Sequence, residues 1–125
     1  MMRVGKTATV ETVVSSKNTA KTIGSGSLDV FATPMMVALM EEAACKCIEG
    51  CIEDGQTSVG TMINTAHIAA SPIGVNVRAT ATLREVDGRK LTFDVLAEDE
   101  KNEIGKGTHT RVIIDAARFM DKIKG

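Results

Sequence analysis

The sequence carries very little aromatic surface. It has no Trp, no Tyr and only three Phe among 125 residues. Proteins that bind single-stranded nucleic acid stack bases on aromatic side chains, and this composition leaves few places for such stacking. The interior must therefore be built from Val, Ile, Leu, Met and Ala.

An excess of charge of one sign is also missing. Fifteen Lys and Arg stand against sixteen Asp and Glu, which gives a formal net charge of -1. A nucleic acid or an anionic membrane would require a basic patch, so neither is predicted as a partner. No stretch approaches the roughly 20 apolar residues of a membrane span, and the N-terminus lacks the apolar run of a signal peptide. These absences predict a soluble, cytoplasmic protein.

The cysteines are few and lie close together, as Cys45, Cys47 and Cys51. On a helix only Cys47 and Cys51 would share a face. The segment offers no further ligands for a metal site, and Lys46 is the only cation nearby in the sequence that could activate a thiol. The cysteines are interpreted as small, buried, unreactive side chains, and no metal is predicted.

The chain is predicted to form a single domain over residues 1–125, which is long enough to bury a core without disulfides or metal. Its amino-terminal part is expected to be a strand over residues 4–14 and a mobile loop over residues 15–29. A long helix should follow, with Thr33 as the capping residue and Pro34 in the first turn, and it should end near Cys51.

After this helix the apolar period changes from 3.6 to 2. Strands are predicted over residues 58–70, 75–86, 90–98 and 104–115, and a short terminal helix over residues 116–124. Asp87-Gly88 is a strong hairpin signal. A meander of these four strands, completed by the first strand and covered by the helix on one face, is an α+β arrangement.

Glu41 is out of place on the long helix. At 3.6 residues per turn its neighbours are Val37, Ala44 and Ile48, which are all apolar, whereas the adjacent Glu42 falls on the polar side. A carboxylate among apolar groups is costly unless it is paired, and perturbed carboxylates gather at functional sites. Glu41 is therefore a candidate functional residue.

Several short motifs together resemble one family. They are VFAT (30–33), MVALME (36–41), SVGT (58–61), HIAASPIG (67–74), VDGRKL (86–91) and EIGKGTHTR (103–111). In this order and spacing the chain resembles the fluoroacetyl-CoA thioesterase family of hotdog proteins. The resemblance implies a hotdog fold, with one long helix on a five-stranded antiparallel sheet, and it implies a hydrolase of acyl-CoA thioesters. No cofactor is implied.

The resemblance also implies the site residues. Thr33, Glu41 and His67 match the family's catalytic positions, and the backbone N–H of Gly60 is the implied oxyanion donor. Glu41 could attack the acyl carbon or activate water, His67 could carry protons, and Thr33 could position the substrate or attack it. His109 also matches a family position but is interpreted as structural. Phe31, Met36 and Met40 are assigned to the substrate pocket, because flexible Met side chains adapt to several acyl shapes.

One geometric difficulty accompanies this assignment. On an unbroken helix Thr33 and Glu41 would lie about 12 Å apart along the axis. Either the chain bends near Pro34, or the two side chains meet only around an extended thioester, or the pocket combines groups from two subunits. Hotdog proteins generally form at least dimers, so a homodimer is expected, with a tetramer left open.

The acyl specificity should differ from that of the fluoroacetate enzyme. The resemblance implies a lid with phenylalanines before the VFAT motif, but residues 19–29 here contain no aromatic residue. A broader acyl-CoA thioesterase is therefore expected, and a carrier-protein thioester remains an open alternative. There are two alternative functions. One is a non-catalytic acyl-thioester binder; the other, an enoyl-thioester hydratase, is disfavoured because no histidine precedes His67.

Overall fold

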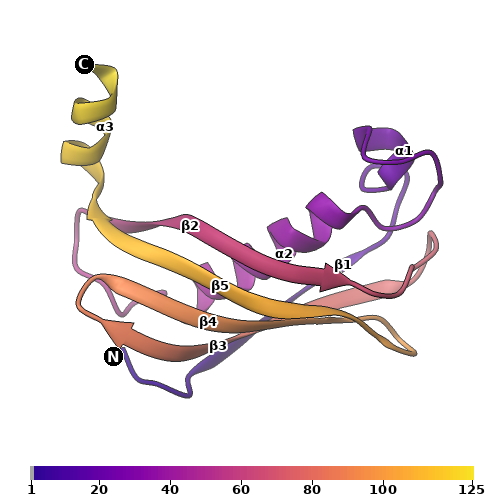
Figure 1. Cartoon of the computed structure of the whole chain (residues 1–125), viewed down its shortest axis with the longest axis horizontal. Helices are drawn as coiled ribbons and strands as arrows, with labels where there is room; N and C mark the ends of the chain where they lie inside the picture. Colours follow the sequence, from indigo (N-terminus) through magenta and orange to yellow (C-terminus); the bar gives the residue numbers. More distant parts are fainter. Residues whose placement is uncertain (1) are drawn as a thin grey trace.

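A long helix lies across one face of a five-stranded antiparallel sheet in the computed structural model, which describes residues 2–125 (Figure 1). The strands are β1 (Thr7–Val13), β2 (Gln56–His67), β3 (Asn76–Asp87), β4 (Lys90–Glu98) and β5 (Glu103–Asp115). The helices are α1 (Ala20–Ile23), α2 (Thr33–Cys47) and α3 (Ala116–Lys124). The predicted α+β hotdog arrangement is confirmed.

The core fills the space between α2 and the sheet. Along α2 the buried side chains recur at helical spacing, and on β3 and β4 they alternate with outward-facing residues, as expected for one buried sheet face. The side chains that meet there include Met36, Met40, Ala44, Leu83 and Phe93. Full burial of one such large side chain stabilises the fold by about 2 kcal/mol.

The predicted four-strand meander is wrong in one respect, because β2 does not lie beside β3. The sheet order is β1-β3-β4-β5-β2, so β2 crosses to the far edge and pairs with β5. The connection after β2 is tied down by a hydrogen bond from the Phe31 N–H to the Ser71 carbonyl (2.9 Å). This tether carries the chain round the end of the sheet before β3 begins, so a hairpin between β2 and β3 does not form.

The helix α2 differs from its prediction at both ends. Its cap is Ala32, which makes no side-chain capping bond, so Thr33 is the first helical residue rather than the cap. The helix ends at Cys47, four residues earlier than expected, because the chain turns at Gly50 with a positive φ of 78°. Between these ends the helix is unbroken.

Two other expectations need correction. The segment over residues 15–29 is not a bare loop, because it contains the short helix α1, capped by the Thr19 hydroxyl. Of the three cysteines only Cys47 is buried, and Cys45 is exposed. The cation beside Cys51 is Lys6, whose Nζ lies 3.1 Å from the Cys51 Sγ, and this contact lowers the pKa of the thiol. Among the described residues, no helix has the length and apolar character needed to cross a bilayer.

The pairing of β2 with β5 depends on a glycine. A Cβ atom added to Gly107 would lie 1.9 Å from the Asn64 carbonyl oxygen, which is part of the facing backbone. We expect Gly107→Ala to destabilise the protein by about 3 kcal/mol, because the backbone of β2 cannot move aside without breaking its ladder with β5. Chemical denaturation would measure this change. Lys106→Ala, on the neighbouring exposed residue, is the control, and equal midpoints for the two variants would contradict the prediction.

Candidate functional site

Thr33 and His67 meet at the start of α2. The Thr33 Oγ1 and the His67 Nδ1 are 2.7 Å apart, which is a short hydrogen bond between residues 34 positions apart in the sequence. Thr33 occupies the first turn of α2, and His67 is the last residue of β2. The hydroxyl is free for this contact because Thr33 does not act as the helix cap. The structure therefore brings these two predicted site residues together.

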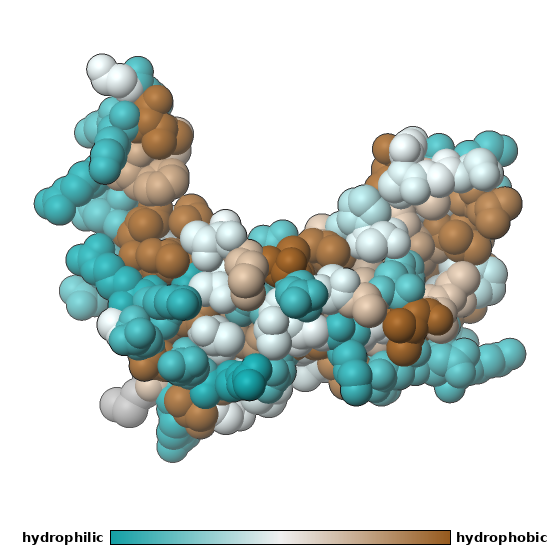
Figure 2. Space-filling model, in the orientation of Figure 1, coloured by the Kyte–Doolittle hydropathy of each residue, from teal (hydrophilic) through white to brown (hydrophobic). Residues whose placement is uncertain are grey.

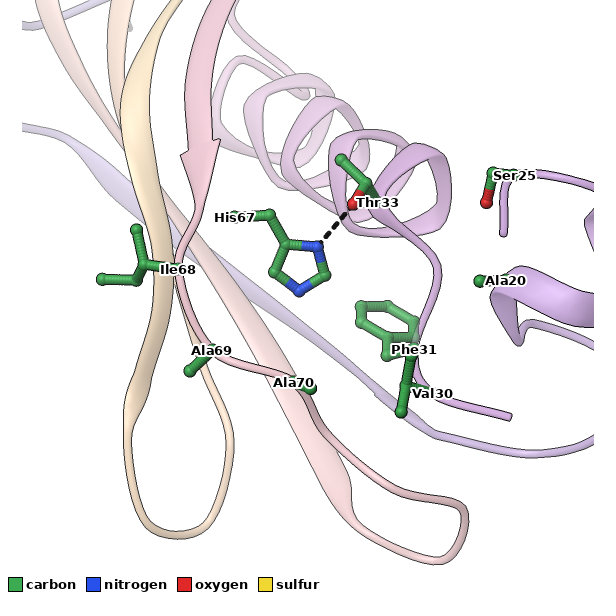
Figure 3. Close-up of a pocket in the computed structure, with 9 residues that line it drawn as sticks. All are labelled: Ala20, Ser25, Val30, Phe31, Thr33, His67, Ile68, Ala69 and Ala70. Carbon is green, nitrogen blue, oxygen red and sulfur yellow. Dashed lines mark hydrogen bonds between the residues drawn. The ribbon is translucent and has the colours of Figure 1, made fainter. Parts of the chain in front are cut away.

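An open pocket of about 270 Å³ lies beside this pair (Figure 3). Its walls come from α1 and the segment after it, from the strand-like residues before α2, and from the chain that follows β2. The lining consists of Ala20, Ser25, Val30, Phe31, Thr33, His67, Ile68, Ala69 and Ala70. Apart from His67 no lining side chain can carry a charge, so the pocket suits an uncharged group.

His67 is held in its neutral form. Burial lowers the pKa of its imidazole below the usual value of about 6.5. Its Nε2 atom is buried and has no hydrogen-bond partner among residues 2–125. When the ring is neutral with its proton on Nε2, Nδ1 is free to accept the proton of the Thr33 hydroxyl. The pair then has the geometry of a nucleophile and its base.

Glu41 belongs to a second cluster. Its Oε2 atom accepts a hydrogen bond from the Arg111 guanidinium (3.2 Å) and lies 3.9 Å from the His109 Nε2. The Glu41 side chain is 40% exposed, whereas that of Arg111 is only 8% exposed. The expected isolated carboxylate is therefore a paired one that reaches the surface, and the pair is anchored by its buried arginine.

Arg111 is fixed by further donors and acceptors. Its Nε donates to the Ser58 hydroxyl (2.8 Å), and its second terminal nitrogen donates to the Ser58 carbonyl (3.0 Å). The nitrogen that reaches Glu41 also contacts the His109 Nε2 (3.2 Å). Because arginine can only donate, Nε2 accepts, and the His109 Nδ1 then donates to the Met62 carbonyl (2.8 Å). Burial lowers the pKa of His109, which keeps this ring neutral.

Gly60 lies directly against Glu41. A Cβ atom at Gly60 would lie 2.7 Å from the Glu41 Oε2 and 3.2 Å from the Arg111 guanidinium. The register of β2 against β5 also shifts between Gly60 and Met62, so the strand bulges at this point. A pocket of about 210 Å³ is lined here by Glu41, Gly60, Thr61, Met62, Ile63 and His109. A side chain at this position would require the Glu41 carboxylate to shift away from its present place.

The predicted site residues therefore fall into two groups within one protomer. Thr33 and His67 line the first pocket, whereas Glu41 and Gly60 line the second. Because α2 is unbroken, Thr33 and Glu41 are about 12 Å apart along its axis. Gly60 and His67 are seven residues apart on β2, or about 23 Å along an extended strand. A bend near Pro34 therefore does not bring Thr33 and Glu41 together.

Two of the three assigned pocket residues are placed differently by the structure. Met36 and Met40 are completely buried in the core and line neither of these pockets, because both point from α2 toward the sheet. Phe31 does line the first pocket. The chain after β2 supplies much of the remaining wall, through Ile68, Ala69 and Ala70. Residues 2–125 contain no cluster of three or more ligating side chains that could hold a metal ion.

The chain is similar to thioesterases over nearly its whole length. Residues 14–117 match the family described as fluoroacetyl-CoA-specific thioesterase. Fluoroacetyl-CoA thioesterase of Streptantibioticus cattleyicolor is 40% identical over 129 residues, covering 98% of this chain and 93% of that protein. The chain belongs to the fluoroacetyl-CoA-specific thioesterase family. The resemblance seen in the motifs and the prediction of a thioester hydrolase are thereby confirmed.

Solved structures agree with this family membership. A point mutant of the fluoroacetyl-CoA-specific thioesterase FlK, in complex with fluoroacetate and CoA, superposes with a TM-score of 0.90 at 40% identity, covering 94% of this chain and 99% of that one. A hot-dog-like protein from Thermanaerovibrio acidaminovorans superposes with a TM-score of 0.88 at 22% identity, covering 96% of this chain and 89% of that one. The second likeness concerns the fold alone.

Arg111 was not among the predicted site residues of this family member, and His109, which was interpreted as structural, contacts it. Both lie on β5 two residues apart, so both point to the same face of the sheet, toward Glu41. The signal available was a charged side chain at an inward position of a long strand. An arginine on a buried face needs a partner, and the unexplained carboxylate on α2 was the obvious one.

We expect both histidines of this thioesterase family member to titrate below about 6.5, because burial disfavours their charged forms. The unfolded chain then binds more protons than the folded one just below that pH. Stability should therefore fall as the pH drops from about 6.5 toward the folded pKa values. NMR of the two imidazoles would measure the midpoints, with His67→Gln assigning the signals. A midpoint for His67 at or above the usual value would contradict the prediction.

Proposed function

We propose that this protein is an acyl-CoA thioesterase whose acyl specificity is broader than, or different from, fluoroacetyl-CoA. The observation that carries the proposal is the hydrogen bond between Thr33 and His67 at an apolar pocket (Figure 3). The pocket can take an uncharged acyl group, and the pair beside it can attack a thioester carbonyl. A relative that was solved with fluoroacetate and CoA supports CoA as the thiol carrier.

The chemistry proposed for the pair requires only groups of this chain and water. The Thr33 oxygen attacks the thioester carbon, its proton passes to the His67 Nδ1, and the CoA thiolate leaves and takes up a proton. Water then hydrolyses the acyl ester on Thr33, with the Glu41 carboxylate as its base. The Gly60 N–H, next to that carboxylate, is the proposed donor to the developing oxyanion. Direct attack by Glu41 is the competing route.

The small side chains that line the pocket before the VFAT motif support a broad acyl specificity. Ala20 and Ser25 are the residues of the segment before the VFAT motif that line it, and both are small. A small, nonaromatic wall leaves room for several acyl shapes and supplies no group that could select fluorine. The cytoplasmic location and the single domain over residues 1–125 stay predictions from the sequence.

A homodimer through β2 is the second part of the proposal. β2 is a 12-residue edge strand, and its sequence QTSVGTMINTAH contains no Asp, Glu, Lys, Arg or Pro. Natural edge strands are usually protected by charge, proline or cover, so a long unprotected edge favours pairing with another strand. Pairing of two such edges in antiparallel fashion would give one continuous sheet.

This dimer would also join the two groups of site residues. In an antiparallel pair, the end of one strand faces the beginning of the other. A two-fold axis at Asn64 would set Ala66 opposite the partner's Met62, and because of the bulge after Gly60 it would set His67 opposite the partner's Gly60. The partner's Glu41, which lies against that glycine, would then approach the Thr33–His67 pair. We propose that each active site combines Thr33 and His67 of one subunit with Glu41 and Gly60 of the other.

Replacing Glu41 should abolish turnover without unfolding the protein. In Glu41→Gln the amide can still accept from Arg111, but it cannot act as a base or nucleophile. We expect kcat to fall by at least about 10²-fold. Thiol release should be followed on short, branched, aromatic and fluorinated acyl-CoA substrates, with His67→Ala as a second inactive variant.

The matched control is Glu42→Gln, which removes the same charge from the neighbouring exposed position. It should retain the wild-type rate. Full activity in Glu41→Gln would end the assignment, and binding without thiol release in the wild type would favour the non-catalytic alternative. Near-normal turnover in Thr33→Ala would favour direct attack by Glu41.

Mixed dimers test whether the site is shared. Glu41→Gln and His67→Ala subunits, carrying different affinity tags, should be co-expressed and purified through both tags. If sites are shared, one of the two sites in this heterodimer has all its residues, and about half the wild-type activity should return. If each site lies within one subunit, both sites carry a substitution and the heterodimer stays inactive. Failure to recover any doubly tagged protein would contradict the dimer itself.

A further inference from the structure

The terminal helix α3 is amphipathic and largely unpartnered within its own subunit. Its apolar side chains recur at helical spacing as Ala116, Phe119, Met120 and Ile123, and none of its residues is buried. Phe119 lines a small pocket together with Ile114 of its own sheet, but Met120 and Ile123 are 45% and 62% exposed. The helix is nonetheless well defined, because the Asp115 carboxylate caps it by accepting from the Arg118 N–H (3.0 Å).

A second group of exposed apolar side chains lies on the segments that contribute residues to the pocket at Thr33. Leu28 and Ile68 are 67% and 63% exposed, and Ile68 lines the pocket itself. Ile23, at the end of α1, is also exposed. Large apolar side chains that gather at a pocket mouth usually indicate a contact surface.

These two apolar groups stand at opposite ends of the β2 edge. α3 follows Asp115, which pairs with Gln56 at the start of β2, and the pocket lies beside His67 at the end of β2. In Figure 1 both α3 and α1 extend beyond the β2 edge, one at each end. Figure 2 shows the hollow between these two arms, with apolar residues along the inner side of the α3 arm and on the floor.

A second copy that pairs through β2 would sit in this hollow. Because antiparallel pairing sets the start of one β2 against the end of the other, α3 of each subunit would stand at the pocket end of its partner. The exposed stripe of α3 would then face the partner's Leu28 and Ile68.

We propose that α3 packs across the dimer and completes the wall of the partner's acyl pocket. This inference rests on the proposed β2 dimer but adds a contact that the dimer does not require. The cover of the pocket within one subunit consists of small residues, Ala20 and Ser25. Met120 and Ile123 of the partner subunit would supply the missing large apolar surface. α3 is thus assigned to acyl recognition, while its polar side, with Lys122 and Lys124, stays in water.

The protein's lack of Trp and Tyr allows a direct test. In Ile123→Trp the only indole reports on the apolar face of α3, and in Lys124→Trp it reports on the polar side of the same turn. We expect Ile123→Trp to emit at shorter wavelength and to resist quenching by acrylamide, and Lys124→Trp to behave as a solvent-exposed indole. Met120→Trp serves as a second reporter should position 123 disturb folding.

Sedimentation of the same samples separates the possible failures. A dimer with an exposed indole at positions 120 and 123 would overturn the contact but leave the proposed dimer intact. A monomer would overturn both. A blue shift that appears only when vesicles of anionic lipid are added would overturn the contact in favour of a membrane surface.

A kinetic test addresses the pocket itself. Met120→Asp combined with Ile123→Asp changes the charge by -2, and so does Lys124→Asp, which is the matched control. We expect the double variant to raise KM for acyl-CoA several-fold and to alter the preference among acyl chains, with a smaller change in kcat. The control should keep both parameters. Unchanged KM and acyl preference in a double variant that remains dimeric would overturn a role of α3 in the pocket.

Discussion

The unbroken helix α2 decides how the site can be built. Its fifteen residues run from Thr33 to Cys47 without a kink, and its buried face is held by the sheet. Thr33 and Glu41 are therefore fixed about two turns apart, whatever their chemistry requires. Each side chain instead has a hydrogen-bond partner on a strand. Thr33 pairs with His67 of β2, and Glu41 pairs with Arg111 of β5. One chain thus contains two separate groups of predicted site residues, the half-sites that the proposed dimer would join.

The Glu41 half-site is organised around a buried charge. The Arg111 guanidinium is nearly inaccessible, so its charge needs an opposite one nearby, and Glu41 provides it from the surface side. Hydrogen bonds from the guanidinium to Ser58 and His109 fix its orientation. The position of the Glu41 carboxylate therefore depends on Arg111 of β5 as much as on α2. The glycine at position 60 is consistent with this arrangement, because a Cβ there would press on that carboxylate.

Much of the fold could be predicted from the sequence because it follows local patterns. The period change after the long helix located the strands, and the terminal helix was placed correctly over residues 116–124. The position of β2 could not be predicted in this way. It depends on contacts between distant segments, including the close approach of Gly107 to Asn64 and the bond between Phe31 and Ser71. Alternation along a strand identifies its faces but not its neighbours.

Only part of the site could be predicted from local sequence patterns. Glu41 could be found from helical periodicity, because its neighbours lie within one turn. His67 and Thr33 came from the resemblance, because nothing local connects residues 34 positions apart. Met36 and Met40 were assigned to the pocket because flexible side chains suit ligands, but the same property makes them good core fillers. Side-chain chemistry alone does not decide which face of a helix a pocket uses.

The exposed edge of β2 is the surface along which the proposed dimer would form. A strand that needed only to close its own sheet would gain from a charge or a proline at its exposed edge, and β2 has neither. Its two ends instead carry apolar arms, and its inner face carries both half-sites. In the proposed dimer, the next register that keeps the same side chains facing the core would move Gly60 relative to the partner's His67 by two residues, about 6.6 Å, and would separate base from oxyanion donor. The proposed apolar contacts at both ends would restrict that register, so both the arms and the unprotected edge would help to align the two subunits.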